Sequence, residues 1–391
     1  MKRFSAQYVF SGCGPPLKRG IITTEDDGTI ISLEDTGGNL TEKGFARFYN
    51  GIIIPGFVNC HCHLELSHLK GVIESGFGLG DFLMNIRSLR NYREEEIIEA
   101  LVNADRAMYN NGISLCADIC NTSLTFGTKK KSSICYINLL EVFGIDSKKA
   151  AVRFREISNL AEKAAEAGLR FSLVPHTPYS VSLPLFRMLK DHTQDNEVTS
   201  IHFMETEGER QFLEDHSGPV EKSYRESRLL PDTLDIPGDH VSTILDEVTS
   251  SGNLILVHNT FADEATVRKV NKRVNTYWCL CPASNMYIEK KLPPVEMLMA
   301  SGCRIVTGTD SLASNTELDI LSELKILSGN FPSADLGELI KWSTLNGAEA
   351  LGMDHIFGSI EPGKKPGLLL LRDADLVNLR LLPGTNILRL I

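Results

Sequence analysis

The sequence contains neither a long hydrophobic run nor a strongly basic segment. No apolar run approaches the roughly eighteen residues that cross a membrane as a helix. The N-terminal segment MKRFSAQYVFSGCGPP also lacks the apolar stretch of a signal peptide. The strongest basic run is Lys129, Lys130 and Lys131, and the formal net charge is -10. We expect these lysines to form a solvated turn, and we expect neither nucleic acid nor a membrane as a partner.

The cysteines form no framework of the kind found in small secreted proteins. There are nine of them, an odd number, and they are scattered along the chain. Cys60 and Cys62, like Cys279 and Cys281, are separated by a single residue, whereas zinc ribbons and redox motifs place two residues between their cysteines. We therefore expect reduced thiols in a cytoplasmic protein.

The sequence does contain a regular alternation of strand-like and helix-like segments. Its 391 residues are enough for a large core, and 42% of them are apolar. The strand-like segments are GFVNCHCH, ISLCADIC, INLLEVF, RFSLVPH, VTSIHFME, NLILVHN, TYWCLCP and CRIVTGTD. Two of the helix-like segments between them, residues 93–112 and 147–168, end in glycine, as helices often do. This alternation predicts an α/β fold, a (β/α)8 TIM barrel over residues 57–355.

Both ends of the chain depart from this alternation. Residues 1–56 and 356–391 contain short strands interrupted by glycine, proline and aspartate. We predict that the two ends pair into one small β-sandwich domain beside the barrel. The polar segment 207–241 interrupts the rhythm after the fifth strand, and we predict a loop over the functional site there.

Polar side chains stand at the ends of the predicted strands, where a barrel of this type carries its active site. His61 and His63 are two residues apart on a strand, so both side chains point to one face and can reach one metal ion. This pair alone is a weak signal. His202, His258 and Asp310 stand at three further strand ends, and imidazole with carboxylate suits zinc or iron(II). The set as a whole predicts a metal site.

Glu205 follows His202 by three residues. A carboxylate in that place can take a proton from an attacking water and hand it to a leaving nitrogen. The alternative is an ordinary glutamate at a helix start, and Glu207 and Glu209 lie nearby. We favour Glu205 as the proton carrier of a hydrolase.

Several segments resemble the successive motifs of the amidohydrolase superfamily, in its cytosine/adenosine-deaminase-like branch. They are PGFVNCHCHLELS, PHTPYSVS, HFMETEGE, LVHN, CPASN and TGTDSLASN, and they extend over nearly the whole chain. The closing GSIEPGKKPGLLLL resembles the last strand segment of the family, with Pro366 and Gly367 where an Ala-Asp pair is common.

The resemblance implies a role for individual residues. One divalent metal ion, zinc first and iron(II) as the alternative, would be held by His61, His63, His202 and Asp310. Glu205 would shuttle protons, His258 would contact the attacking water, and Asp310 would also accept a proton from it. Two-metal members of the superfamily need a lysine at the end of the fourth strand, and RFSLVPH has none. Its absence favours a single metal and deamination.

The implied activity is the hydrolytic deamination of an aromatic amine. HLELS resembles the HLEFS-type run of aminodeoxyfutalosine deaminases, so we favour a small 6-aminopurine nucleoside-like substrate such as aminodeoxyfutalosine or adenosylhomocysteine. The residues expected to bind the substrate are His176, Glu65, Arg87, Arg90, Ser284 and Asn285. Four of them have a structural alternative: a turn histidine for His176, a polar partner inside the barrel mouth for Glu65, and a solvated helix face for the two arginines.

Two other functions stay open. The same site could hydrolyse another C–N bond or a C–Cl bond, as guanine deaminases, cytosine deaminases and chlorohydrolases do. A non-catalytic barrel could also hold a metal as a scaffold. Glu205 and His258 argue against the scaffold, because a structural zinc site needs neither a proton carrier nor an open position. The sequence also leaves a homodimer open.

Overall fold

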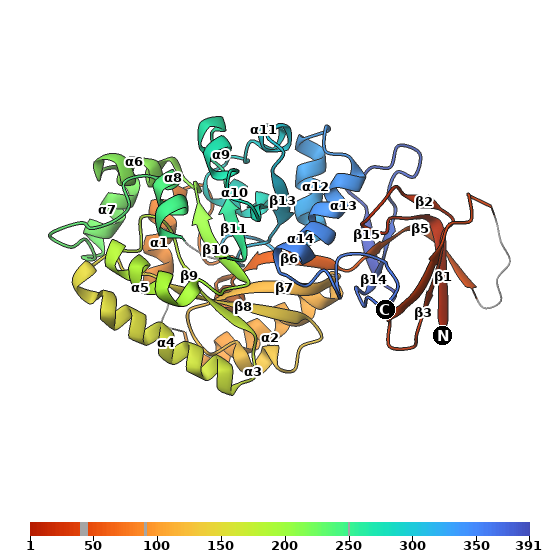
Figure 1. The fold of residues 1–391 in the computed structure, drawn as a ribbon, viewed down its shortest axis with the longest axis horizontal. Coiled ribbons are helices and arrows are strands. Elements are labelled where there is room, and N and C mark those ends of the chain that lie inside the picture. Colours follow the sequence, from red (N-terminus) through yellow and green to blue (C-terminus); the bar gives the residue numbers. More distant parts are fainter. Residues whose placement is uncertain (40–45, 90–91, 249–250) are drawn as a thin grey trace.

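Eight parallel strands in two sheets form the centre of the computed structural model, which describes residues 1–39, 46–89, 92–248 and 251–391 (Figure 1). The first sheet contains β6 (Phe57–Cys62), β7 (Ile113–Cys120), β8 (Cys135–Val142) and β9 (Phe171–Pro175). The second contains β10 (Val198–Phe203), β11 (Asn253–His258), β12 (Thr276–Leu280) and β13 (Arg304–Thr307). Each strand overlaps one of the predicted segments, with β8 beginning two residues before its segment, and the predicted α/β architecture with parallel strands is confirmed.

Backbone hydrogen bonds connect the two sheets at the carboxyl ends of their edge strands. The amide of His202 on β10 donates to the carbonyl of His176, which follows β9, at 2.9 Å. At the other junction, the amides of Thr309 and Asp310 donate to the carbonyl of His61 on β6 at 3.0 and 3.1 Å. The two junctions therefore bring four of the residues singled out in the sequence to the same end of the strands.

Helices between the strands cover the sheets (Figure 1). The predicted long helices are α2 (Glu94–Asn110) and α4 (Ala150–Glu166). Gly112 and Gly168 follow them with φ of 87° and 70°, a left-handed conformation that glycine adopts without the steric cost of a Cβ. Further helices between the strands include α5 (Leu183–Thr193), α9 (Glu264–Val270), α10 (Pro282–Ile288) and α11 (Val295–Ala300). Strand β7 is buried at every position because both faces of its sheet are covered.

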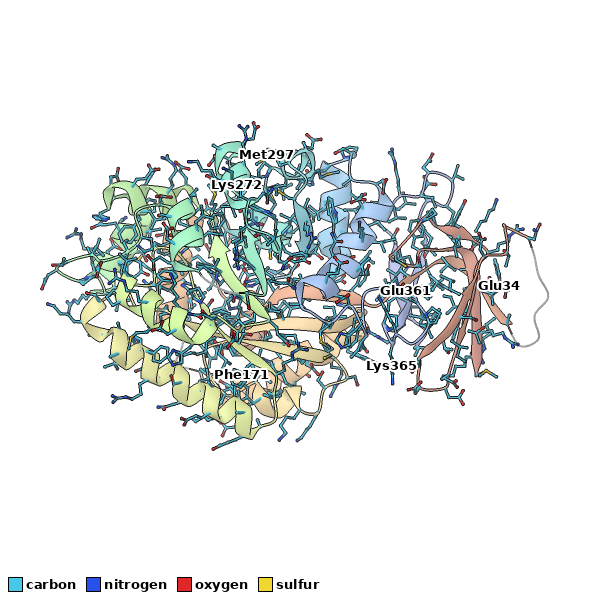
Figure 2. The ribbon with its side chains drawn as sticks, viewed as in Figure 1. Glu34, Phe171, Lys272, Met297, Glu361 and Lys365 are labelled. Atoms are coloured by element: carbon cyan, nitrogen blue, oxygen red, sulfur yellow. The ribbon has the colours of Figure 1, made fainter. Side chains whose placement is uncertain are left out.

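The carboxyl-terminal part of the chain adds helices and then joins the N-terminal strands in a separate sheet. After β13 come α12 (Ile320–Asn330), α13 (Leu336–Trp342) and α14 (Leu345–Ala350). The seven-stranded sheet contains β1 (Lys2–Val9), β2 (Leu17–Lys18), β3 (Ile21–Thr24), β4 (Ile30–Glu34), β5 (Ala46–Pro55), β14 (Leu368–Arg372) and β15 (Asn386–Arg389). Strand β14 pairs antiparallel with β5. Glu361 and Lys365, which precede β14, lie where this sheet meets the rest of the molecule (Figure 2).

The segment 207–241 differs from the prediction, because much of it is helical. It forms α6 (Glu207–Asp215) and α7 (Gly218–Glu226), and α8 (His240–Ser242) begins at its end. Helix α7 packs on α1 (Gly78–Ser88), which follows the first parallel strand and the short 3-10 helix Leu64–Leu69. The buried Phe212, Val220 and Tyr224 explain why a polar segment folds here, since they form a small apolar core with α1.

Lys129 corrects a second expectation, because it is not part of a solvated turn. It ends α3 (Phe126–Lys129) with its side chain fully buried, and its Nζ lies 2.5 Å from Oδ2 of the equally buried Asp118. Asn138 Oδ1 accepts from the same ammonium at 2.8 Å. Lys130 and Lys131 are exposed, as expected. Within the described ranges, no helix has the length and apolarity to cross a membrane.

Candidate metal centre and catalytic site

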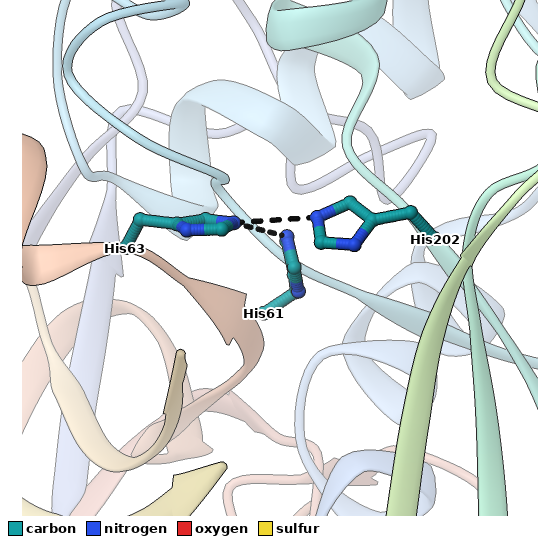
Figure 3. Close-up of side chains that lie close together, drawn as sticks. All are labelled: His61, His63 and His202. Atoms are coloured by element: carbon teal, nitrogen blue, oxygen red, sulfur yellow. Dashed lines mark hydrogen bonds between the residues drawn. The ribbon is translucent and has the colours of Figure 1, made fainter. Parts of the chain in front are cut away.

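Three imidazoles converge at the carboxyl ends of β6 and β10 (Figure 3). Nε2 of His63 lies 3.1 Å from Nε2 of His61 and 3.4 Å from Nε2 of His202. Ligand nitrogens at the corners of a tetrahedron around zinc are about 3.4 Å apart, given Zn–N bonds of about 2.1 Å. The spacing of the three nitrogens therefore matches a tetrahedral metal site.

Asp310 completes this arrangement. Its Oδ1 lies 3.5 Å from Nε2 of His63 and 3.7 Å from Nε2 of His61. Its Oδ2 accepts hydrogen bonds from Ser284 and Ser314, both at 2.6 Å, which fix the orientation of the carboxylate. Burial acts to raise the pKa of Asp310, but the histidines beside it, His61 above all, hold that pKa well below its ordinary value. The carboxylate is therefore anionic at neutral pH.

The histidines present neutral nitrogens to this carboxylate. Burial lowers the pKa of His63 to about 4. Burial, followed by the neighbouring imidazoles, lowers the pKa of His202 well below its ordinary value. A metal ion needs the lone pair of an unprotonated imidazole, so these residues fit the donor set of a divalent metal such as zinc.

Contacts at Nδ1, the nitrogen that does not face the other histidines, fix the orientation of the His202 ring. Its Nδ1 lies 3.0 Å from the carbonyl oxygen of His176 and 3.4 Å from Oε1 of Glu141. Histidines that bind metals usually donate from the second nitrogen to such an oxygen, which fixes the ring. Glu141 faces the nitrogen that points away from His61 and His63, so it supports the site from outside the ligand set. Sequence reasoning missed Glu141, although it stands near the end of a predicted strand as the other site residues do.

Glu205 and His258 lie together beside the metal-ligand cluster. Oε1 of Glu205 is 3.6 Å from Nε2 of His258, and both side chains are buried. Burial, followed by the negative charge of Asp310, raises the pKa of Glu205 well above its ordinary value. Burial also lowers the pKa of His258 to about 3. Both groups are thus held in their neutral forms unless a ligand changes their surroundings, and Glu205 is suited to carrying a proton.

A cavity opens over these residues. One wall is polar and carries Asn121, Glu141 and His176. Another is apolar and consists of side chains from α1, namely Leu79, Phe82, Leu83 and Ile86. Tyr224 of α7 also lines the cavity, so the segment 207–241 forms part of the cavity wall. The cavity therefore joins a catalytic end to an apolar extension.

The predicted substrate contacts fall into different places. His176 and Arg87 line the cavity, and the Arg87 guanidinium lies 5.1 Å from the centre of the Tyr224 ring and donates to Ser223 and Ser227. Arg90 lies outside the described residues.

Three other predicted contacts are placed behind the cavity wall. Oε2 of Glu65 accepts from the amides of Asn121 and Thr122, both at 3.1 Å, which is the structural alternative considered for it. Ser284 donates to Asp310. Nδ2 of Asn285 lies 3.2 Å from Nδ1 of His258, and so Asn285 orients that ring.

Together, a cluster of neutral imidazoles, a buried carboxylate and a glutamate with a raised pKa, all at the carboxyl ends of parallel strands, fit the site of a metal-dependent hydrolase. Comparison with known proteins also identifies a hydrolase family. The model of the amidohydrolase family matches residues 52–382, and the chain belongs to this family. The predicted class, an amidohydrolase-type enzyme of the deaminase branch, is thereby confirmed.

Curated relatives and solved structures resemble most of the chain. An adenosine deaminase from Helicobacter pylori is 27% identical over 341 residues, covering 82% of this chain and 79% of that protein. An aminodeoxyfutalosine deaminase from Nitratiruptor sp. is 27% identical over 363 residues, covering 87% and 85%. The crystal structure of Helicobacter pylori aminofutalosine deaminase in complex with methylthio-coformycin has a TM-score of 0.77 and 24% identity, covering 95% of this chain and 92% of that chain. This last likeness shows a shared fold.

Proposed function

We propose that this chain deaminates a 6-aminopurine nucleoside that carries an apolar 5′ substituent. The observation that carries this proposal is the buried pair of Glu205 and His258 beside the metal-ligand cluster, at the inner end of a cavity with an apolar extension. The curated relatives named adenosine deaminase and aminodeoxyfutalosine deaminase support the nucleoside class.

The proposed site is held by His61, His63, His202 and Asp310, with zinc as the first choice because the nitrogens have tetrahedral spacing. Bound there, the ion would supply Lewis acidity and lower the pKa of water. Glu205 would take one proton from the attacking water and give it to the ring nitrogen. When the added hydroxyl becomes the ring carbonyl, Glu205 would take the hydroxyl proton and pass it to the amine, which leaves as ammonia. Water adds at the carbon that bears the amine, and the products are ammonia and a ring carbonyl. His258 lies within reach of the same centre and stabilises the developing tetrahedral carbon.

The cavity walls support the substrate class. A ribose offers hydroxyl groups to the polar wall of Asn121, Glu141 and His176, whereas the apolar side chains of α1 accommodate a 5′ substituent. Arg87 stands at the edge of this apolar wall and would meet an anionic group at the far end of the substituent.

The fold around this site is part of the proposal. We infer that the two parallel sheets close into one (β/α)8 barrel over residues 57–355, supported by the hydrogen bonds at both junctions. Residues 1–56 and 356–391 would then form a β-sandwich domain with its own apolar core, to which Phe4, Ile53 and Leu370 contribute.

A substrate panel tests the proposed reaction. The zinc-loaded chain is incubated with adenosine, with adenosine derivatives that carry an apolar 5′ substituent, with guanine and cytosine, and with a chlorinated triazine, and release of ammonia or chloride is measured. We expect ammonia from the nucleosides, with kcat/KM at least about tenfold higher for the 5′-substituted ones, because one buried aromatic or alkyl group contributes about 1.5–3 kcal/mol. Turnover of the triazine or of a free base, without any nucleoside, would favour the alternative hydrolase.

A further inference from the structure

The catalytic Glu205 stands in a turn of unusual backbone conformation. Strand β10 ends at Phe203, and Met204 follows with φ of 50°, a left-handed conformation that is unfavourable for a residue other than glycine. This turn aims the Glu205 side chain at the metal-ligand cluster. Such a turn persists only where its surroundings hold it, and its amides are buried.

Glu209 holds this turn. Its Oε2 accepts a hydrogen bond from the amide of Glu205 at 3.1 Å, and its Oε1 accepts from the amide of Met204 at 3.3 Å. Glu209 is in the first turn of α6, and its side chain is almost completely buried. One carboxylate therefore satisfies both amides of the turn that carries the catalytic residue.

His240 in turn holds Glu209. Its Nε2 lies 2.8 Å from Oε1 of Glu209, and its ring packs edge-on against Phe203 with the ring centres 5.3 Å apart. His240 comes from the end of the segment 207–241, 31 residues after Glu209. The side chain of Asp239 accepts from the amides of Val241 and Ser242, which fixes the backbone that presents His240.

We propose that Glu209 and His240 form a positioning pair for Glu205. Neither residue lines the cavity, so the pair acts through the backbone of the turn and not through the substrate. Removing the imidazole leaves Oε1 of Glu209 with only its longer bond to Met204, which frees the carboxylate to rotate and the turn to relax. The inference deepens the proposed function, since it rests on Glu205 as the proton carrier.

Kinetics of matched variants test the consequence for catalysis. His240→Leu removes the donor, Glu209→Gln replaces one acceptor oxygen by a donor, and His240→Gln keeps a donor near the original one. We expect His240→Leu and Glu209→Gln to lose about 10–100-fold in kcat, because displacement of a catalytic group by about 1 Å costs up to about 10²-fold. KM and the metal content should stay within about twofold, and His240→Gln should recover most of the loss. Two residues outside this contact provide controls, the partly exposed Glu207→Gln on the same helix and the exposed His192→Leu on α5.

Hydrogen exchange tests the contact itself without any substrate. In the zinc-loaded chain, the amides of Met204 and Glu205 are expected to exchange slowly, because each is buried and bonded to Glu209. A peptide that covers residues 203–206 should exchange at least about tenfold faster at these amides in His240→Leu and Glu209→Gln, and at the wild-type rate in Glu207→Gln and His192→Leu.

The two measurements separate this inference from the proposed function. If the wild-type chain deaminates no nucleoside, the proposed function fails, while the exchange rates still decide whether the pair holds the turn. Unchanged exchange in His240→Leu would overturn the inference even if the enzyme is active. A fall in kcat and in metal content together with a rise in KM, without recovery in His240→Gln, would also overturn the inference. Such a result would indicate a general structural role for the pair.

Discussion

The Glu205 carboxylate lies 3.6 Å from Nε2 of His258, with both side chains buried beside the metal-ligand cluster. Neither is one of the four residues that match the metal geometry, so this pair adds a chemical function to the site that metal binding alone does not require. It distinguishes the site from a structural metal centre, in which the protein ligands fill the coordination sphere.

Glu205→Gln tests the proton carrier. The amide has nearly the shape of the carboxyl group but cannot carry a proton, so we expect kcat to fall by about 10²–10⁴-fold. Metal content, measured by elemental analysis, should remain at the wild-type level. Glu207→Gln, two residues away and partly exposed to solvent, should keep full activity. Near-normal turnover in Glu205→Gln would remove Glu205 from the mechanism.

Metal stoichiometry tests the single site. We expect about one zinc or iron per chain, because the donor atoms of His61, His63, His202 and Asp310 gather in one place. A chelator should abolish activity, and added zinc or iron(II) should restore it. His202→Ala should lose the ion, whereas the exposed His192→Ala should retain it. Two ions per chain in the wild-type protein would contradict the assignment.

Lys129→Met tests the buried ion pair with Asp118. Both side chains are fully buried, so removal of the ammonium leaves a buried carboxylate without its cation. We expect the free energy of unfolding to fall by about 3–5 kcal/mol, measured by denaturant titration. Asp118 also accepts from the amide of Leu64, next to His63, so metal affinity should fall too. Lys130→Met, at an exposed position, should change the free energy of unfolding by less than about 0.5 kcal/mol.

The raised pKa of Glu323 predicts that the free energy of unfolding depends on pH. Burial raises the pKa of this carboxyl from its ordinary value of 4.5 to about 8, although Ala283 and Asn315 donate hydrogen bonds to it. Between these two values the folded chain binds more protons at this residue than the unfolded chain does, so its contribution to stability is lost as the pH rises.

The variant Glu323→Gln removes this proton linkage. Unfolding at pH 5, 7 and 9 should show the wild-type chain losing stability relative to Glu323→Gln as the pH rises to about 8, with a constant difference above that value. The constant part reflects the altered hydrogen bonds and carries no information on the pKa. Parallel stability curves for the two proteins over the whole range would show that the pKa is not raised.

Arg87→Leu tests the far end of the cavity. Arg87 lines the cavity and is already oriented by Ser223, Ser227 and the Tyr224 ring. For a nucleoside whose 5′ substituent ends in a carboxylate, we expect KM to rise about 10–100-fold, since a charged hydrogen bond contributes about 1.5–3 kcal/mol. For adenosine, KM should change by less than about threefold. The exposed Arg93→Leu serves as the control, and equal effects on both substrates would argue against a carboxylate contact.

The sequence by itself determined the order of the strands and the residues proposed for the site. The eight strand-like segments, the two long helices with their terminal glycines, and His61, His63, His202, Glu205, His258 and Asp310 could be read from local patterns. Strands buried on both faces are continuous apolar runs, and polar residues that end such runs stand out in one dimension.

Only the tertiary structure decided which of the other polar residues support the site. Lys129 is buried because Asp118, eleven residues earlier on a different element, neutralises it there. Glu65, Ser284 and Asn285 bond to protein groups. Glu141 was missed although it stands near the end of a predicted strand, and Glu209 and His240 join the site without a signal that sequence patterns carry. A charged or polar side chain is buried only where a partner compensates the loss of water, and such partners are brought together by the fold and not by nearness in the chain.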